Sequence, residues 1–175
     1  MIPLEPQYTY SNRSYWYPQS PVTDFATATL TVTVPGDLDA VASGAQQGPP
    51  TSVPGPAGER NRKQFVFETS SPARYLAVLI SRFRPGAAVR LDLLEGGGSL
   101  TLTLAANPRQ MSKVRNLTEK TTEILEFYTS LLGHAPYEAF TLALTENDVP
   151  GGHSPAYFAL LNNPLPTSPF VWSND

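Results

Sequence analysis

Residues 107–133 read NPRQMSKVRNLTEKTTEILEFYTSLLG. Apolar residues recur in this segment at steps of three and four, which is the spacing of one face of an α-helix. Asn107 suits the N-terminal cap of such a helix and Pro108 suits its first position. Gly133 suits the residue after its C-terminal end. The segment therefore predicts one long helix over 108–132, capped by Asn107.

The sequence before this helix predicts β-strands. Residues 26–34 alternate apolar side chains with threonine, and 64–69 place two phenylalanines on one face. Such alternation is typical of a strand with one buried face. Residues 75–83 are almost continuously apolar, which is typical of a central strand buried on both faces.

Two alternating runs on either side of a glycine-rich turn, 89–94 and 100–104, predict a hairpin. A last alternating run over 139–145 predicts one more strand after the helix. The fold class we expect is α+β: an antiparallel β-rich part, sandwich-like or saddle-like, then one long helix and a further strand. We expect a β-rich domain over 1–105 and the incomplete start of a second domain over 106–175.

Proline accounts for 18 of the 175 residues, about twice its usual share. Many of these prolines lie in the segment 44–63 and in the tail after residue 147. Both segments contain few large apolar side chains, so we expect 44–63 to be an exposed loop and most of the tail to be irregular.

The composition excludes several classes of function. The net charge is −3 with 12 Lys and Arg residues, whereas a nucleic-acid binder normally carries a basic surplus. No apolar run reaches the ~18 residues that a membrane-spanning helix needs. Cysteine is absent and there are two histidines, so the chain lacks thiolate ligands and has few imidazole ligands for a complete zinc site.

Several short motifs follow one another along most of the chain. In the first half they are an aromatic–proline segment (15–21), a strand ending at proline (34–35), a step of small residues to glycine (41–44), a Phe-containing strand (64–67), a proline turn (71–73) and a Tyr-Leu-rich strand (74–83). In the second half they are the end of the long helix (125–133), a Pro-Tyr step (136–137) and the next strand (140–144). Their order and spacing resemble the gluzincin zinc aminopeptidases, the alanyl or membrane aminopeptidase family, over about 15–175.

This resemblance implies that the chain covers the end of a saddle-like β domain and the start of a metallopeptidase catalytic domain. In that family, zinc and a glutamate base hydrolyse peptide bonds. The His-Glu-x-x-His zinc motif is absent from this chain. We therefore expect zinc and a peptide substrate in a larger parent protein, no cofactor and no catalytic or metal-binding residue in this chain, and no activity from the chain alone.

The family reads its substrate with a Gly-x-Met-Glu-Asn strand, and the matching segment here is residues 149–155. By this resemblance, Gly151, Gly152, His153 and Ser154 are substrate-binding residues. Glycine also suits a backbone that approaches a ligand closely. We expect this segment and the strand 139–145 to pair with an extended peptide. The other interpretation of His153, a loop histidine without a chemical role, stays open.

Other polar and aromatic residues favour ordinary structural roles. His134 follows the helix end and suits a surface or capping position. Glu146 and Asp148 are interpreted as solvated loop acids, and the aromatic residues 15–17 as a plug over a sheet edge. The alternative function is a non-catalytic β-rich interaction module. The helix has more apolar surface than this chain can cover, so we expect self-association through it. The sequence determines no cellular compartment.

Overall fold

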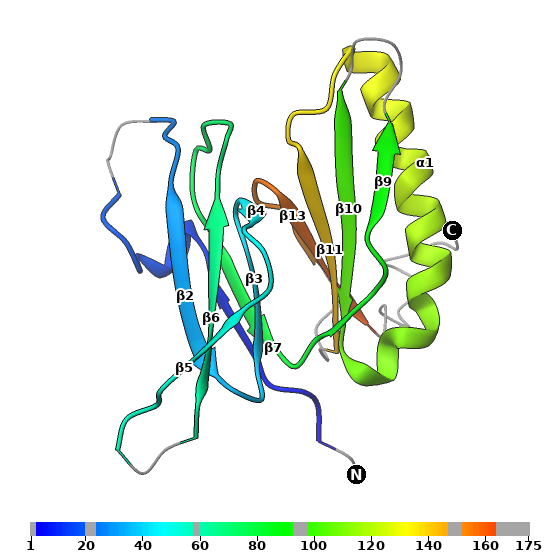
Figure 1. The fold of residues 1–175 in the computed structure, drawn as a ribbon. Coiled ribbons are helices and arrows are strands. Elements are labelled where there is room, and N and C mark those ends of the chain that lie inside the picture. Colours follow the sequence, from blue (N-terminus) through cyan, green and yellow to red (C-terminus); the bar gives the residue numbers. More distant parts are fainter. Residues whose placement is uncertain (1–2, 20–23, 58–59, 93–97, 147–151, 164–175) are drawn as a thin grey trace.

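The computed structural model describes residues 3–19, 24–57, 60–92, 98–146 and 152–163, and its fold class is α+β. Three sheets and one long helix are arranged in layers (Figure 1). The outermost sheet contains four strands in the order β2-β6-β4, with β5 also paired to β6. Its strands are β2 (Thr29–Pro35), β4 (Ala45–Gln46), β5 (Thr51–Val53) and β6 (Arg62–Glu68). The segment 44–63 thus adds two short strands to β6 where we expected only an exposed loop.

The middle sheet is short and antiparallel, with the order β1-β7-β3. Side chains alternate across a strand, and in β7 Val78 packs toward the outer sheet while Leu79 packs toward the other side. The predicted central strand within 75–83 is therefore confirmed. Its strands are β1 (Gln7–Tyr10), β3 (Asp39–Ala42) and β7 (Val78–Ser81), and a 3₁₀ turn, η1 (Asn12–Ser14), follows β1.

The third sheet is mixed and contains six strands in the order β12-β13-β11-β10-β8, with β9 also paired to β10. The predicted hairpin is confirmed, because β9 and β10 pair antiparallel. However, β11 runs parallel to both β10 and β13, so the long helix is the crossover of a β-α-β unit. The strands are β8 (Arg84–Pro85), β9 (Val89–Asp92), β10 (Ser99–Ala106), β11 (Ala139–Glu146), β12 (Gly152–His153) and β13 (Phe158–Asn163).

Two apolar cores lie on the two faces of this third sheet. Ala105, Ala143 and Phe158 face the middle sheet and pack with Leu79. Leucines of β9, β10 and β11 face the helix instead (Figure 1). The chain passes from the middle sheet to the third sheet between β7 and β8. The strands β8 and β9, which precede residue 105, therefore share a sheet with β11, β12 and β13, which follow it. The expected division into domains at 105 stays a prediction.

The long helix begins differently from the prediction. Residues Pro108–Lys113 form a 3₁₀ helix, η2, and α1 follows over Val114–Leu132. Gly133 ends α1 in the left-handed conformation, as predicted, with φ of 85°. Asn107 makes no side-chain capping bond. Its Oδ1 accepts from the backbone N–H of Glu146 at 2.9 Å, and its Nδ2 donates to Ser81 Oγ at 2.8 Å.

Glu146 is not the solvated loop acid that we expected, because it is only 4% exposed at the end of β11. Arg109 donates to its carboxylate from both Nε and Nη2. A buried carboxylate is costly unless it is paired and hydrogen-bonded. The bonds from Arg109 therefore lower the pKa of Glu146 below its ordinary value, outweighing the opposite effect of burial. Arg109 Nη2 also donates to the carbonyl of Pro3, which attaches the N-terminal segment to this site.

One side of α1 packs on the third sheet and another side is exposed. Val114, Leu117 and Leu125 contact the leucine core of that sheet. The exposed apolar side chains of the helix are Ile124, Phe127, Tyr128, Leu131 and Leu132. These exposed residues are the apolar surface from which the sequence predicts self-association, which stays a prediction. Among the described residues, no helix is both long and apolar enough to cross a membrane.

Substituting Asn107 with Asp separates the capping role from the buried role. Asp caps a helix about as well as Asn, but it has no Nδ2 to donate to Ser81 Oγ and the Arg82 carbonyl. We expect Asn107→Asp to lower the free energy of unfolding by about 2–4 kcal/mol. The matched change Asn116→Asp, at an exposed position of α1, should stay within about 0.5 kcal/mol. Urea unfolding of both variants measures this, and an unchanged Asn107→Asp would show that the buried bonds contribute little.

Candidate functional site

The sequence-predicted site residues fall at one edge of the third sheet. Gly152 and His153 form β12, the terminal strand of that sheet among the described residues, paired antiparallel with β13. Ser154 follows directly, whereas Gly151 lies outside the described residues. A Cβ atom on Gly152 would lie 2.6 Å from the carbonyl oxygen of Leu160. Glycine is therefore required here by close contact between β12 and β13.

The strand predicted to pair with a peptide is not available for that pairing. We expected 139–145 to add an extended peptide, but β11 lies between β10 and β13 and is hydrogen-bonded on both sides. Only a strand with unpaired backbone groups on one side can accept another strand. At this end of the sheet, that strand is β12.

A hollow of about 330 Å³ lies beside this edge, and we call it the aromatic pocket. One wall is the turn 72–75 from the first half of the chain, together with Phe25. The other wall comes from the third-sheet half, at Tyr137, Phe140 and 154–156. Among the predicted site residues that the structure describes, Ser154 alone lines the pocket.

Hydrogen bonds from the outer sheet position the first wall. Ala26 and Ala73 exchange two backbone bonds, of 3.2 and 2.9 Å. The Thr69 hydroxyl accepts from the backbone N–H of Ala28 at 2.6 Å, just before the turn. These bonds place Phe25 beside the turn 72–75.

Tyr157 joins the two walls, and nothing in the sequence indicated it. It is 1% exposed, and its backbone has a φ of 72°, which non-glycine residues adopt only at a cost. Its hydroxyl accepts from the backbone N–H of Ser71 at 2.9 Å and lies 3.3 Å from Ser70 Oγ. Its ring packs on Tyr137, with 4.2 Å between ring centroids. Ser70 also donates to the carboxylate of Glu138, which adds a second link between the walls.

His153 stacks near Tyr75, with ring centroids 6.3 Å apart. Its Nε2 is buried without a hydrogen-bond partner in the structure. Burial lowers the pKa of His153, and the charge of Arg13 lowers it further. The ring is therefore neutral at pH 7 and does not supply a positive charge for a substrate. Its position beside Tyr75 places it next to the pocket wall.

Burial raises the pKa of Tyr137. The phenol is therefore a neutral hydroxyl at pH 7, able both to donate and to accept a hydrogen bond.

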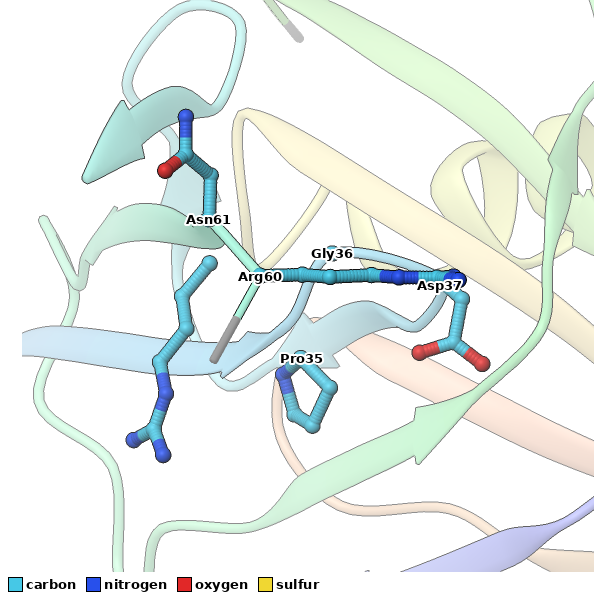
Figure 2. A pocket seen from close by; sticks show the side chains of 6 residues that line it. Pro35, Gly36, Asp37, Arg60 and Asn61 are labelled. Atoms are coloured by element: carbon cyan, nitrogen blue, oxygen red, sulfur yellow. The ribbon is translucent and has the colours of Figure 1, made fainter. Parts of the chain in front are cut away.

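A second hollow of about 480 Å³ lies in the first half of the chain, where β2 ends and β6 begins. In Figure 2 the Arg60 side chain extends toward Asp37. Asp37 already accepts from Arg82 at 2.9 Å, and this bond lowers its pKa. None of the predicted site residues that the structure describes lines this hollow.

The structure places the remaining candidates in structural roles. Trp16 packs against the core between the outer and middle sheets, and the Tyr17 hydroxyl accepts from the backbone N–H of Leu76 at 3.0 Å. These contacts agree with the predicted aromatic plug, although Tyr15 is exposed. His134 is exposed after α1. In the part of the chain that the structure describes, no three His, Asp or Glu side chains gather in a group that could hold a metal ion.

Replacing Tyr157 with Phe tests the link between the two walls. The change leaves the half-buried N–H of Ser71 without its acceptor, so we expect a loss of about 1–2 kcal/mol in the free energy of unfolding. Tyr128→Phe, on the exposed side of α1, should change it by less than about 0.5 kcal/mol. Thermal and urea unfolding compare the two. Equal stabilities would mean that the Tyr157 hydroxyl does not hold the turn.

The lowered pKa of His153 predicts a pH dependence of stability. Below its ordinary pKa of 6.5, the unfolded chain binds a proton at His153 that the folded chain binds only at lower pH. Stability from this residue is therefore complete above 6.5 and falls as the pH drops below it. We expect His153→Gln to lose less stability than wild type between about pH 7.5 and about pH 5.5. His134→Gln should keep the wild-type dependence, and identical slopes in all three proteins would contradict the assignment.

Comparison with known proteins identifies the architecture. No family model matches this chain, and no curated protein matches it. The M1 zinc metallopeptidase from Deinococcus radiodurans matches with a TM-score of 0.63 and 19% identity, over 86% of this chain and 33% of that one. A mutant of that protein bound to the peptide Tyr-Ser-Ala matches with a TM-score of 0.58 and 20% identity, over 79% and 30% of the two chains. The chain spans about a third of the length of these structures, and over that third it has the fold of an M1 zinc metallopeptidase, as the resemblance predicted.

Proposed function

We propose that this chain is part of a zinc-dependent, aminopeptidase-like metallopeptidase and that it forms one wall of the peptide-binding cleft. The observation that supports this most directly is the location of the predicted substrate-binding segment. Gly152 and His153 lie at a sheet edge, and Ser154 lines a pocket beside it. The fold shared with M1 zinc metallopeptidases adds independent support.

In this proposal, the backbone of β12 binds the substrate backbone. An edge strand offers N–H and C=O groups to an extended peptide, which then becomes a further strand of the sheet. Because Gly152 has no side chain, the backbone of β12 can lie close to the Leu160 carbonyl of β13. Gly151 completes the proposed segment, together with Gly152, His153 and Ser154.

Zinc would supply the chemistry, but not through the residues described here. Those residues include no group of three potential ligands. The proposed metal site therefore belongs to another part of the parent protein. What this segment contributes is the position of the peptide, and the isolated chain is proposed to be inactive.

The substrate class follows from the proteins that share the fold. One of them is a mutant bound to Tyr-Ser-Ala, which is described as its substrate. By that likeness, we propose a peptide as the substrate of the parent protein. The exposed apolar side of α1 favours a second candidate function, a protein interaction module, and we propose that a second copy of the chain can bind there.

Zinc content and peptide hydrolysis test the main proposal. The full gene product that contains this chain should bind zinc and hydrolyse Tyr-Ser-Ala, whereas the 175-residue chain alone should do neither. In the full product, Gly152→Val should lower kcat/KM by at least about 10-fold, because the added side chain displaces β12 from β13. Zinc content should not change in that variant.

Thr31→Ala, on the exposed face of β2, is the control and should keep full activity. A full product without zinc and without hydrolysis would contradict the enzyme proposal. A fully active Gly152→Val would contradict the role of β12.

A further inference from the structure

The strand β2 lies at one edge of the outer sheet, and among the described residues it pairs with β6 alone. Its seven residues make it the longest strand that has a neighbour on one side only in the described part of the chain. In Figure 1 it lies on the side of the molecule away from α1. This edge is therefore separate from the exposed apolar side of the helix and from the edge at β12.

The hydrogen bonds at the start of β2 show which backbone groups of this strand face its open side. The Ala28 carbonyl accepts from the Thr69 N–H at 3.0 Å, so Ala28 directs its backbone groups toward β6. Along an antiparallel pair, residues that bond to the partner strand alternate with residues that do not. Thr29, Thr31 and Thr33 therefore direct their N–H and C=O groups away from β6.

The bonds on the other side of β6 agree with this assignment. Val66 lies opposite Thr31, and its carbonyl accepts from the Gln47 N–H at 2.8 Å. Because Val66 bonds away from β2, it does not pair with the backbone groups of Thr31. Among the described residues, no other strand reaches the open side of β2. The strand thus offers an N–H and a C=O at every second residue.

This edge lacks the features that usually protect a sheet edge from pairing. Such features are charged side chains, prolines within the strand and bulges. Residues 25–35 contain no Lys, Arg, Asp or Glu. The register with β6 skips no residue from Thr29 to Pro35, so the strand has no bulge. The one proline of β2 is its last residue.

The core beneath β2 is incompletely covered at this edge. Val34 is buried, whereas Leu30 and Val32, on the same face of the strand, are half-buried and pack against the core between the outer and middle sheets. A strand added beside β2 brings its own apolar face next to these two side chains. Pairing at this edge therefore buries apolar surface and also satisfies backbone groups.

A second copy of β2 fits this edge. The segment carries no charge, so a copy of it meets no like charge along the strand. An antiparallel pair centred on Thr31 places Thr31 opposite itself and Thr29 opposite Thr33, so all three open positions form hydrogen bonds. Leu30 then lies opposite Val32. Such a contact uses the same surface on both copies and closes at two chains.

We propose that two copies of this chain pair antiparallel through β2, with the two-fold axis beside Thr31, and join their outer sheets into one continuous sheet. This inference goes beyond the proposed function, because it needs neither zinc nor a peptide. It is also independent of the proposed contact through α1. A strand of seven residues is well below the ~20–30 residues a side of a stable interface, so we expect a reversible dimer with a Kd of roughly 0.1–1 mM.

Charge substitutions at Thr31 test the axis on the 175-residue chain. Thr31→Lys and Thr31→Glu each place like charges opposite one another, which opposes pairing. Sedimentation equilibrium should show that each variant alone dimerises at least about 10-fold more weakly than wild type. An equimolar mixture of the two variants should dimerise again, because opposite charges then meet at the axis.

Two control variants distinguish this edge from other surfaces. Thr51→Lys changes an exposed threonine of β5 in the same sheet, with the same change in net charge, and should keep the wild-type Kd. Leu131→Lys changes a residue of α1 that is 68% exposed. It should also leave this Kd unchanged. Urea unfolding checks that every variant is folded.

A single introduced cysteine gives a second test that adds no charge. The chain contains no cysteine, so a disulfide in such a variant can form only between two copies. Residues opposite each other in a hydrogen-bonded antiparallel pair have Cα atoms about 5.5 Å apart, within the range that a disulfide spans. With oxidised glutathione, Thr31→Cys should cross-link at least about 10-fold faster than Thr51→Cys.

The results decide between this edge and the alternatives. A wild-type chain that stays monomeric at about 1 mM, a dimer that Thr31→Lys leaves intact, or a dimer that Leu131→Lys abolishes would each overturn the inference. Equal cross-linking of the two cysteine variants would overturn it as well. Dimers that respond to Thr31 alone would support it even if the full gene product held no zinc, a result that would contradict only the enzyme proposal.

Discussion

Burial of the middle sheet on both faces is the constraint on which the other layers depend. In β7, Val78 belongs to the core with the outer sheet, and Leu79 belongs to the core with the third sheet. Because side chains alternate along a strand, a slip of one residue would exchange these two sets. The register of β7 therefore sets the packing of both neighbouring sheets at once. This explains why a strand of four residues is almost entirely apolar.

The polar bonds at the end of β7 extend this constraint to the site. Asn107 connects Ser81 with the backbone of Glu146, so the ends of β7 and β11 are held together. Glu146 is buried, and its ion pair with Arg109 offsets the energetic cost of burying the carboxylate charge. These bonds lie at the end of β11. On one side β11 pairs with β13, and β13 in turn pairs with the edge strand β12. The position of the edge strand is thus tied to a buried polar cluster.

Much of this fold was predictable from the sequence because burial leaves a periodic pattern. The alternation in 26–34, the hairpin around the glycine turn and the apolar run in 75–83 each corresponded to an observed strand arrangement. The helix and its terminal Gly133 were predictable for the same reason. Such patterns report which face of an element is buried, and they do not report which element covers it.

The errors follow from that limit. Asn107 matches a helix cap, but an Asn whose side chain joins the ends of two strands looks the same in the sequence. Glu146 was interpreted as a solvated acid because its partner, Arg109, is distant in the chain and only the fold brings the two together. The alternation in β11 did not reveal that β11 is paired on both sides. The left-handed Tyr157 had no signal, because that conformation is normally associated with glycine.

A sheet edge that binds a peptide, as we propose for β12, has to meet two opposing requirements. A long exposed edge binds peptides but also promotes aggregation. Here the edge strand is two residues long and contains a glycine, so it offers little binding energy by itself. If β12 binds a peptide as we propose, further binding energy must come from a neighbouring surface, and the aromatic pocket lies beside this edge. Because Tyr157 links the two walls, the pocket can form only when both halves of the chain have folded. In the proposed function, the edge strand and the pocket beside it are therefore brought together only in the native fold.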